Sequence, residues 1–288
     1  MSSIIIFNKN NVALNGNNNV LEYDFNNTSL NFKNMEIALG SIQMYNSQYN
    51  ISSSFNNTTF QIQVPTGSTY QTVSINLPDG YYKYTDISNY ISTQLVSIGA
   101  YLIDSAGNQI TYLRITDNPT YYSCQIDLLA TPTTLPSGYT RPSTGLYSSG
   151  GSGLPTASNT PKIVLLNNNF TKTVGFSAGT YPSTTQTTDQ SFLSNFTPAA
   201  HPVSSYLIRC NIVDNKVSNP PDILTTFSTQ GSTIGEMIDV KPNELSWIRI
   251  NDGIYNNITL TIIDQEYRDA ILKDPDILIT ILLRERKA

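Results

Sequence analysis

The chain has 288 residues and a formal net charge of −5. Its length allows one large β domain or two ordinary ones. Its acidity argues against general affinity for nucleic acid, because phosphate binding needs clustered Lys and Arg. Charged residues make up only 13% of the sequence, about half the usual share, so Asn, Ser, Thr, Gln and Tyr supply the polar surface. Such side chains hydrogen-bond without the desolvation cost of burying charges, which suits a protein whose surface is covered by other protein.

The two cysteines, Cys124 and Cys210, both lie in apolar, strand-like surroundings. This setting favours two buried free thiols over a disulfide. The N-terminus lacks the basic start and long apolar core of a secretion signal. The longest apolar runs, such as residues 95–103, are far shorter than the ~18–20 residues that span a bilayer. We therefore expect no membrane-spanning segment and a protein that is intracellular or is assembled inside a cell.

The first part of the chain divides into an arm and a group of strands. Residues 1–33 are rich in Asn and have little hydrophobic periodicity, which predicts an extended or poorly ordered arm. Residues 35–45, 59–65 and 72–78 then alternate or cluster β-branched and aromatic residues. Turn signals containing Pro and Gly bound these runs, so each is expected to be a strand.

One helix is predicted after these strands. Thr85 is expected to cap its N-terminus and Gly99 to end it. The residues that fall at helical spacing are Ile87, Tyr90, Ile91 and Leu95. We expect this apolar face to pack on a sheet.

A long irregular segment interrupts the later strand patterns. After expected strands at 110–116 and 121–129, residues 130–161 are rich in Pro, Gly, Ser and Thr. A connection of this length is unusual in a compact domain, so we expect a surface insertion that is mobile or functional. Further strands are expected at 162–167, 204–214, 222–228, 245–250, 258–264 and 276–283.

Many strands, one helix and no internal repeat predict an all-β protein. Pairing of strands across long sequence gaps favours a Greek-key or jelly-roll sandwich. We expect residues 34–288 to form a single jelly-roll β-sandwich with one short helix and a long loop insertion at about 130–161.

Residues suited to catalysis are scarce. The one histidine, His201, precedes Pro202 and has no acid close to it in the sequence, which favours an ordinary loop histidine over a member of a catalytic triad. The glycine-rich stretches 175–182 and 231–236 lack the lysine and the strand-to-helix setting of a phosphate loop.

Two other features have a structural and a functional interpretation. Asp274 and Asp276 could share a calcium ion or act as glycosidase partners, but Pro275 between them favours a turn before a strand. Eighteen tyrosines and the single Trp247 could form a carbohydrate surface, although such residues serve more often in cores and interfaces. We expect no enzyme, and no catalytic, cofactor-binding or metal-binding residues.

An ordered series of segments goes beyond a generic β protein. It consists of NNNFTKTVGFSAGTYP (167–182), SFLSNFTP (191–198), VSSYLIRCNIVDN (203–215), PPDILTTFS (220–228) and the closing stretch 245–283. In order and spacing the series resembles the minor capsid, or penton, proteins of polinton-like viruses and virophages. The resemblance covers roughly residues 160–285 and, more loosely, 78–98. The 130–161 insertion departs from the family pattern.

The resemblance implies a single jelly roll that forms a homopentamer at the icosahedral fivefold vertex. It implies a protein of the virion, assembled inside the host cell, that contacts the surrounding major capsid capsomers. Internal capsid proteins and a vertex fibre are further partners that it allows. A carbohydrate- or receptor-binding jelly-roll module, such as a lectin or a fibre head with 130–161 as recognition element, stays open as the alternative.

The C-terminal stretch joins an apolar strand to a charged end. First and last strands of a jelly roll are adjacent and antiparallel, so the arm and the charged end are expected together, and the resemblance implies that this end faces the capsid interior. Residues 277–283 are expected to be buried on both sides, because the run is almost continuously apolar. The candidate assembly-interface residues are Arg284, Glu285, Arg286 and Lys287.

Three interpretations of these four residues stay open. They could be a solvated end that protects an apolar strand from aggregation. They could form ion pairs with a neighbouring subunit or an internal capsid protein. They could contact the packaged genome, although Glu285 dilutes the positive patch and three cations give little binding.

Overall fold

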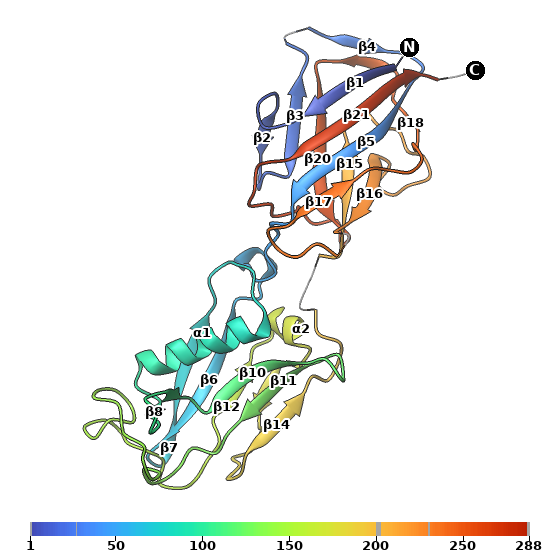
Figure 1. The fold of residues 1–288 in the computed structure, drawn as a ribbon. Coiled ribbons are helices and arrows are strands. Elements are labelled where there is room, and N and C mark those ends of the chain that lie inside the picture. The colour runs from blue at the N-terminus through green and yellow to red at the C-terminus, as the bar shows by residue number, and fades with distance from the viewer. Residues whose placement is uncertain (1, 27, 200–202, 230, 287–288) are drawn as a thin grey trace. The chain divides into compact units, whose positions relative to one another are not determined.

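The computed structural model describes residues 2–26, 28–199, 203–229 and 231–286, and most of its ordered elements are β-strands. The chain forms two compact units, unit 1 (residues 1–49 and 203–288) and unit 2 (residues 50–202), so that unit 2 is an insertion in the sequence of unit 1 (Figure 1). Each unit has a hydrophobic core of its own. The predicted all-β class is confirmed. The chain forms two compact units rather than the expected single domain, because its apolar strands pack into two separate cores.

Unit 1 is a jelly roll. Its strands are β1 (Ser2–Phe7), β2 (Ala13–Asn15), β3 (Val20–Asp24), β4 (Leu30–Phe32), β5 (Met35–Tyr45), β15 (Ser205–Cys210), β16 (Ile223–Ser228), β17 (Met237–Val240), β18 (Ile248–Arg249), β19 (Gly253–Tyr255), β20 (Asn257–Asp264) and β21 (Leu278–Glu285). The main strands form two sheets, ordered β1-β21-β5-β17 and β16-β15-β20-β3, while β18 and β2 pair with them and β4 pairs with β19.

The pairing pattern of the eight main strands defines the topology. In chain order they pair first with last, second with seventh, third with sixth and fourth with fifth, always antiparallel. Successive pairs alternate between the two sheets, as in the double Greek key of a jelly roll. The predicted jelly roll is therefore present, but residues of unit 2 separate its third strand from its fourth.

The residues expected to form an extended or poorly ordered arm belong to this sandwich. They make strands β1 to β4, and their side chains Phe7 and Leu21 are completely buried. Three asparagines between or beside the strands, Asn18, Asn26 and Asn34, have φ values of 60°, 53° and 53°. Asparagine tolerates this left-handed conformation, so the Asn-rich composition forms tight turns between short strands.

The closing strand β21 pairs with β1 in antiparallel register, from Ser2 opposite Arg284 to Phe7 opposite Ile279. The predicted adjacency of the first and last strands is confirmed. Burial along β21 alternates: the buried side chains are Ile279, Ile281 and Leu283, and the half-buried ones are Leu278, Thr280 and Leu282. The expectation that this strand is buried on both sides is therefore wrong, and one of its faces points away from the core.

Unit 2 combines two main sheets and one two-stranded sheet with two α-helices and a short 3-10 helix. Its elements are η1 (Ser53–Phe55), β6 (Thr59–Thr66), β7 (Thr69–Asn76), α1 (Tyr84–Ser97), β8 (Leu102–Ile103), β9 (Gln109–Ile110), β10 (Leu113–Asn118), β11 (Ser123–Leu128), β12 (Lys162–Leu165), α2 (Phe170–Val174), β13 (Gly179–Tyr181) and β14 (Gln190–Leu193). The sheets are ordered β13-β12-β6-β7 and β10-β11-β14, β8 pairs with β9, and α1 packs against β10 (Figure 1).

The predicted helix is present as α1, with Ile87, Ile91 and Leu95 in the core. It begins at Tyr84 instead of after a Thr85 cap, because the Asp86 carboxylate accepts a hydrogen bond of 2.9 Å from the Lys83 N–H. Gly99 has a φ of 70° just beyond the last turn, as expected of a glycine that ends a helix. The short helix α2 was not predicted, because so short a helix has too few residues to show a periodicity.

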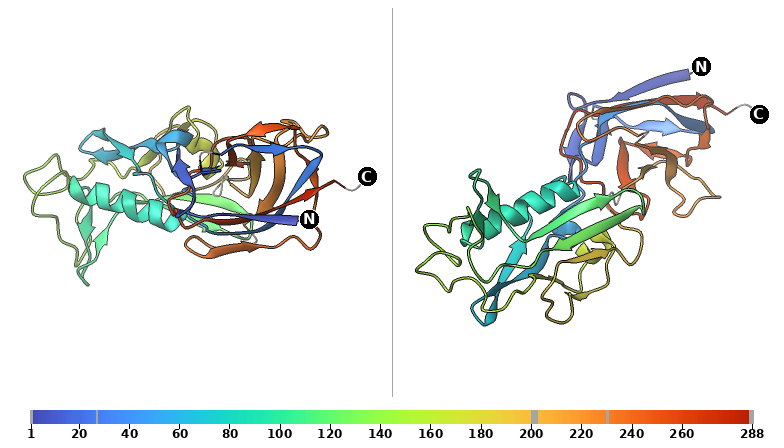
Figure 2. Two further views of the ribbon diagram at one scale, coloured as in Figure 1. Left: turned by 90° about the horizontal axis from the view of Figure 1, so that it is seen from above. Right: turned by 60° about the horizontal axis from the view of Figure 1, so that its bottom comes forward.

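The 130–161 segment forms irregular loops at one end of unit 2, near the end of α1 (Figure 2). Its Tyr147 is 1% exposed, and the hydroxyl donates a 2.9 Å hydrogen bond to the Pro65 carbonyl. Gly145 lies so near Gly99 that a Cβ on Gly99 would be 2.6 Å from the Gly145 Cα. The segment is thus anchored in the core of unit 2 rather than added to its surface.

Candidate assembly surface

The outward face of the β1-β21-β5-β17 sheet is the candidate functional surface. Side chains alternate between the two faces of a strand. Ile281 is buried in the core, so the residues on either side of it, Thr280 and Leu282, lie on the outer face of the sheet. The register sets Ile4 opposite Leu282 and Ile6 opposite Thr280. We use "outer sheet face" for the residues that this alternation places together: Ile4, Ile6, Gly40, Ser41, Gln43, Met237, Asp239, Leu278, Thr280 and Leu282.

Apolar side chains are unusually exposed on this face. Ile4, Ile6 and Met237 are 63%, 44% and 51% exposed. A bulge in the pairing of β21 with β5 leaves Gly40 beneath Thr280 and Leu282, where a Cβ would lie 3.3 Å from atoms of both side chains. The centre of the face is therefore apolar or small and uncharged, which is the character of a protein interface core.

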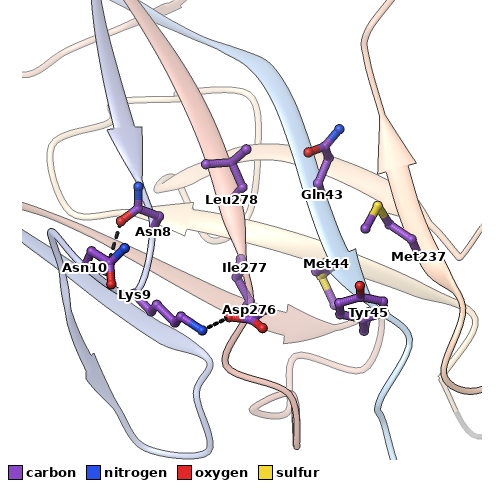
Figure 3. Close-up of a pocket in the computed structure, with 10 residues that line it drawn as sticks. All are labelled: Asn8, Lys9, Asn10, Gln43, Met44, Tyr45, Met237, Asp276, Ile277 and Leu278. Carbon is purple, nitrogen blue, oxygen red and sulfur yellow. Dashed lines mark hydrogen bonds and ion pairs between the residues drawn. The ribbon is translucent and has the colours of Figure 1, made fainter.

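A hollow of about 320 Å³ lies at one end of the outer sheet face (Figure 3). It is lined by Asn8, Lys9 and Asn10 after β1, by Gln43, Met44 and Tyr45 at the end of β5, by Met237, and by Asp276, Ile277 and Leu278 at the start of β21. Lys9 forms an ion pair with Asp276 at its margin, and this carboxylate, as hydrogen-bond acceptor and as charge, raises the pKa of Lys9. The hollow thus has an apolar wall and a charged rim.

The same geometry settles the role of the Asp274–Asp276 pair. The Asp274 carboxylate accepts a 2.8 Å hydrogen bond from the Asp276 N–H, as in a turn stabilised by an Asp side chain. The other carboxylate pairs with Lys9. The predicted turn before the last strand is confirmed.

At the other end of β21, Arg284 contacts its own chain. Its guanidinium lies 2.9 Å from a carboxylate oxygen of Glu36, and its central carbon is 3.9 Å from the centre of the Trp247 ring. Glu36 keeps only 15% of its side chain exposed. Such an ion pair combined with a cation–π contact fixes the end of the strand. Arg284 therefore serves an internal contact, which none of the three sequence-based interpretations included.

The other charged residues of the C-terminus are placed differently. Glu285 and Arg286 are exposed, and Arg286 lies 3.8 Å from a Glu36 oxygen. Lys287 lies outside the described residues. The structure brings Arg284 and Arg286 together on Glu36, while Glu285 is exposed at the end of β21 with its backbone opposite Met35.

The described residues offer little for chemistry. Among them, no group of three or more His, Cys, Asp or Glu side chains is placed to hold a metal ion. Cys124 and Cys210 are free and buried, as predicted, and burial raises the pKa of Cys210 to about 12. His201 lies outside the described residues. Within the part of the chain that the structure describes, neither helix has the length and apolarity to cross a membrane.

Sequence reasoning missed the main residues of this surface. Ile4 and Ile6 were assigned to an extended or poorly ordered arm, Glu36 received no site role, and Trp247 was considered only as part of a carbohydrate surface or as a core or interface residue. The β-branched run at residues 4–6 was a usable signal, since such a run favours a strand. Nothing local could show that its partner is the last strand of the chain.

No protein-family model and no curated protein matches the chain. Among solved structures, the chain is similar to the mavirus penton protein, with a TM-score of 0.44, 11% sequence identity and coverage of 99% of this chain and 98% of that chain. It is also similar to a chain in the cryo-EM structure of the Sputnik virophage, with a TM-score of 0.40, 12% identity and coverage of 99% and 98%.

Proposed function

We propose that this chain is a structural viral capsid protein and that it forms a homopentamer at the fivefold vertices of an icosahedral particle. The observation that carries the proposal is the outer sheet face of the jelly-roll unit, where Ile4, Ile6 and Met237 are exposed, Asp239 lies on the edge strand β17, and ion pairs lie at the margins. The resemblance of the ordered segments between residues 160 and 285 to penton proteins supports the same assignment. In this role the protein works through its contacts with other capsid subunits, and no catalytic step is proposed.

A fivefold ring requires two different surfaces on each subunit. In head-to-tail association one surface of a subunit meets another surface of the next, and the ring closes when the rotation completes a circle. We assign the outer sheet face to one side of this contact. Burying the exposed parts of Ile4, Ile6 and Met237 stabilises the ring by about 1 to 2 kcal/mol for each side chain.

Contacts with the surrounding major capsid capsomers then fall to the remaining surface of the ring. Glu285 and Arg286 are exposed and available for an internal capsid protein or a neighbouring subunit, whereas Arg284 already pairs with Glu36. The proposed assembly-interface role of the C-terminal charges therefore narrows to Glu285 and Arg286, with Lys287 outside the described residues. The small number of cations disfavours a role in genome binding.

The test is the oligomeric state of the purified protein and of a variant with a charge on this face. Wild type is expected to form five-membered rings by negative-stain microscopy and light scattering. Ile4→Asp is expected to give monomers, because an unpaired carboxylate in an apolar interface costs several kcal/mol. Its fold should persist, since the Ile4 side chain points away from the core.

Thr226→Asp is the matched control. Thr226 is exposed on β16 of the other sheet, so a carboxylate there should leave the rings intact. Wild-type monomers or trimers would contradict the pentamer. Rings formed as well by Ile4→Asp as by wild type would show that the outer sheet face is not the contact.

A further inference from the structure

A second hollow, of about 250 Å³, lies at the turn between β10 and β11 in unit 2. It is lined by Tyr84, Asp117, Asn118, Pro119, Tyr122, Ser123 and Pro198. These residues come from the start of α1, from the β10–β11 turn and from the segment after β14. Three separate parts of unit 2 thus shape one concave surface.

Two of the residues that line this hollow, Tyr84 and Tyr122, are aromatic, and Tyr121 is the neighbour of Tyr122 in the turn. Tyr121 and Tyr122 are 67% and 75% exposed at the tip of the turn. Tyr84 forms the floor, 5% exposed, and its hydroxyl donates a 2.8 Å hydrogen bond to the Thr173 carbonyl. Since that hydroxyl is already engaged, Tyr84 offers the hollow its ring.

The backbone of Tyr122 is in an uncommon conformation, with a φ of 50°. A bulky residue in the left-handed region is an outlier that persists only where surrounding structure enforces it, and such outliers gather at ligand-binding sites. Here the Tyr122 N–H bonds to the Pro119 carbonyl at 3.3 Å, and Asn118 pairs with Ser123 across the turn. The turn holds the Tyr122 ring against the hollow at the expense of local strain.

Polar groups at the rim are available for a ligand. Asp117 is exposed, and within the described residues its carboxylate has no hydrogen bond or ion pair. The Asn118 amide donates to Gln125 at 2.7 Å, which leaves its carbonyl oxygen free to accept. The Ser123 hydroxyl donates to the Tyr121 carbonyl at 3.0 Å and can still accept. The rim therefore presents acceptors beside aromatic faces.

We propose that this hollow binds a neutral saccharide unit. A sugar ring has an apolar C–H face, which stacks on an exposed aromatic ring, and a rim of hydroxyl donors, which suits carboxylate and amide oxygens. A few placed polar groups in an otherwise apolar hollow are the usual composition of a small-ligand site. The Asp117 carboxylate disfavours anionic sugars, because a second negative charge would lie beside it. The ring of Tyr122 provides stacking and Asp117 sets the orientation.

The experiment uses the full chain and a panel of methyl glycosides, observed by saturation-transfer NMR and titration calorimetry. At least one neutral glycoside is expected to bind, with a millimolar or tighter Kd, while a sialoside binds more weakly. Tyr122→Gly keeps the left-handed backbone without strain and removes the ring, so it should lose at least about tenfold in affinity without losing stability. Asp117→Asn should weaken binding, and Tyr122→Phe should retain it.

Tyr267→Ala is the matched control, because Tyr267 is likewise left-handed, with a φ of 62°, is 56% exposed and lies in unit 1. It should leave the affinity unchanged. Absence of binding by every glycoside would overturn the proposal, as would equal binding by Tyr122→Gly and wild type. An apolar peptide that bound the hollow in place of every sugar would also overturn it. Ring formation is measured on the same samples, so that failure here and failure of the pentamer are separate results.

Discussion

The outer faces of the two sheets of unit 1 carry different side chains, although their inner faces share one core. On the β16-β15-β20-β3 sheet, Arg209 pairs with Asp222 at 2.7 Å, and the Asn257 amide donates to Glu22 at 2.7 Å. On the outer sheet face, charged pairs lie at the two ends, Asp239 lies on the edge strand β17, and the centre is apolar or small and uncharged.

The difference shows that inner positions of the sheets determine the fold, whereas outer positions determine whether a sheet is suited to contact with water or with another protein. Inner positions of both sheets must be apolar to close the sandwich, whatever lies outside. Outer positions are free to match their environment. The polar sheet matches water, whereas the outer sheet face has the exposed apolar side chains that the proposed subunit contact would cover.

The largest effect on stability is expected from a substitution at an inner position of β21, compared with one at the neighbouring outer position. Ile281→Ala removes a completely buried side chain from the core and is expected to lower the free energy of unfolding by about 2 to 5 kcal/mol. Leu282→Ala, on the half-buried outer side, should cost the isolated subunit clearly less but weaken ring formation. Denaturant unfolding and light scattering of both variants measure this. Equal destabilisation by the two variants would contradict the inside–outside division.

A smaller effect is expected at the charged end of β21. Arg284→Met removes both the cation–π contact with Trp247 and the partner of the mostly buried Glu36 carboxylate. The free energy of unfolding should fall by about 1 to 3 kcal/mol.

The neighbouring Arg286→Met provides the control for this comparison. Its guanidinium is 53% exposed and 3.8 Å from Glu36, so thermal or denaturant unfolding should change by no more than about 0.5 kcal/mol. If Arg286→Met were as costly as Arg284→Met, the specific role of Arg284 would be refuted. Loss of rings in Arg286→Met at normal stability would instead mark it as a contact with a partner.

A still smaller effect on the free energy of unfolding is expected at moderately high pH from the thiol of Cys210, which lies on the inner face of the polar sheet. Burial raises the pKa of the Cys210 thiol from about 9 to about 12. A raised pKa means that the folded state binds the proton more tightly, so its stabilisation is complete below pH 9 and is lost as pH rises toward 12. At pH 10 the cost is about 1 kcal/mol.

Comparing Cys210→Ala with wild type across this range isolates the thiol. Wild type should lose stability faster above pH 9 than the variant does, and Cys210 should resist a thiol reagent until the protein unfolds. Rapid modification of Cys210 in the native protein at pH 8 would contradict its burial.

Strand periodicity and turn signals were sufficient for the features that depend on short stretches. They identified the all-β class, the α1 face with Ile87 and Ile91, and the turn at Asp274. The buried thiols followed from apolar neighbours in the sequence. Each of these features depends on residues that are close together in the sequence, so a short stretch is enough to predict it.

The errors arose where distant segments meet. The residues of the sandwich's first strands were predicted to be an extended or poorly ordered arm, because β2 and β4 are very short and separated by asparagines. Only pairing with β3 and β19 makes them strands. The 130–161 segment was judged a surface insertion because its composition hides the anchor Tyr147. The sequence could not predict that there are two cores, because an apolar residue does not indicate which core it packs into.

The closing strand shows how the two sources of information divide. Its apolar, β-branched sequence by itself determined that residues near 277–283 form a strand of the core, because backbone preference and hydrophobicity are local properties. Only the tertiary structure decided which of its faces lies inside, that Ile4 stands beside Leu282, and that Arg284 is held by Glu36 and Trp247. Those contacts join residues far apart in the chain, and register between such segments is set by packing in three dimensions.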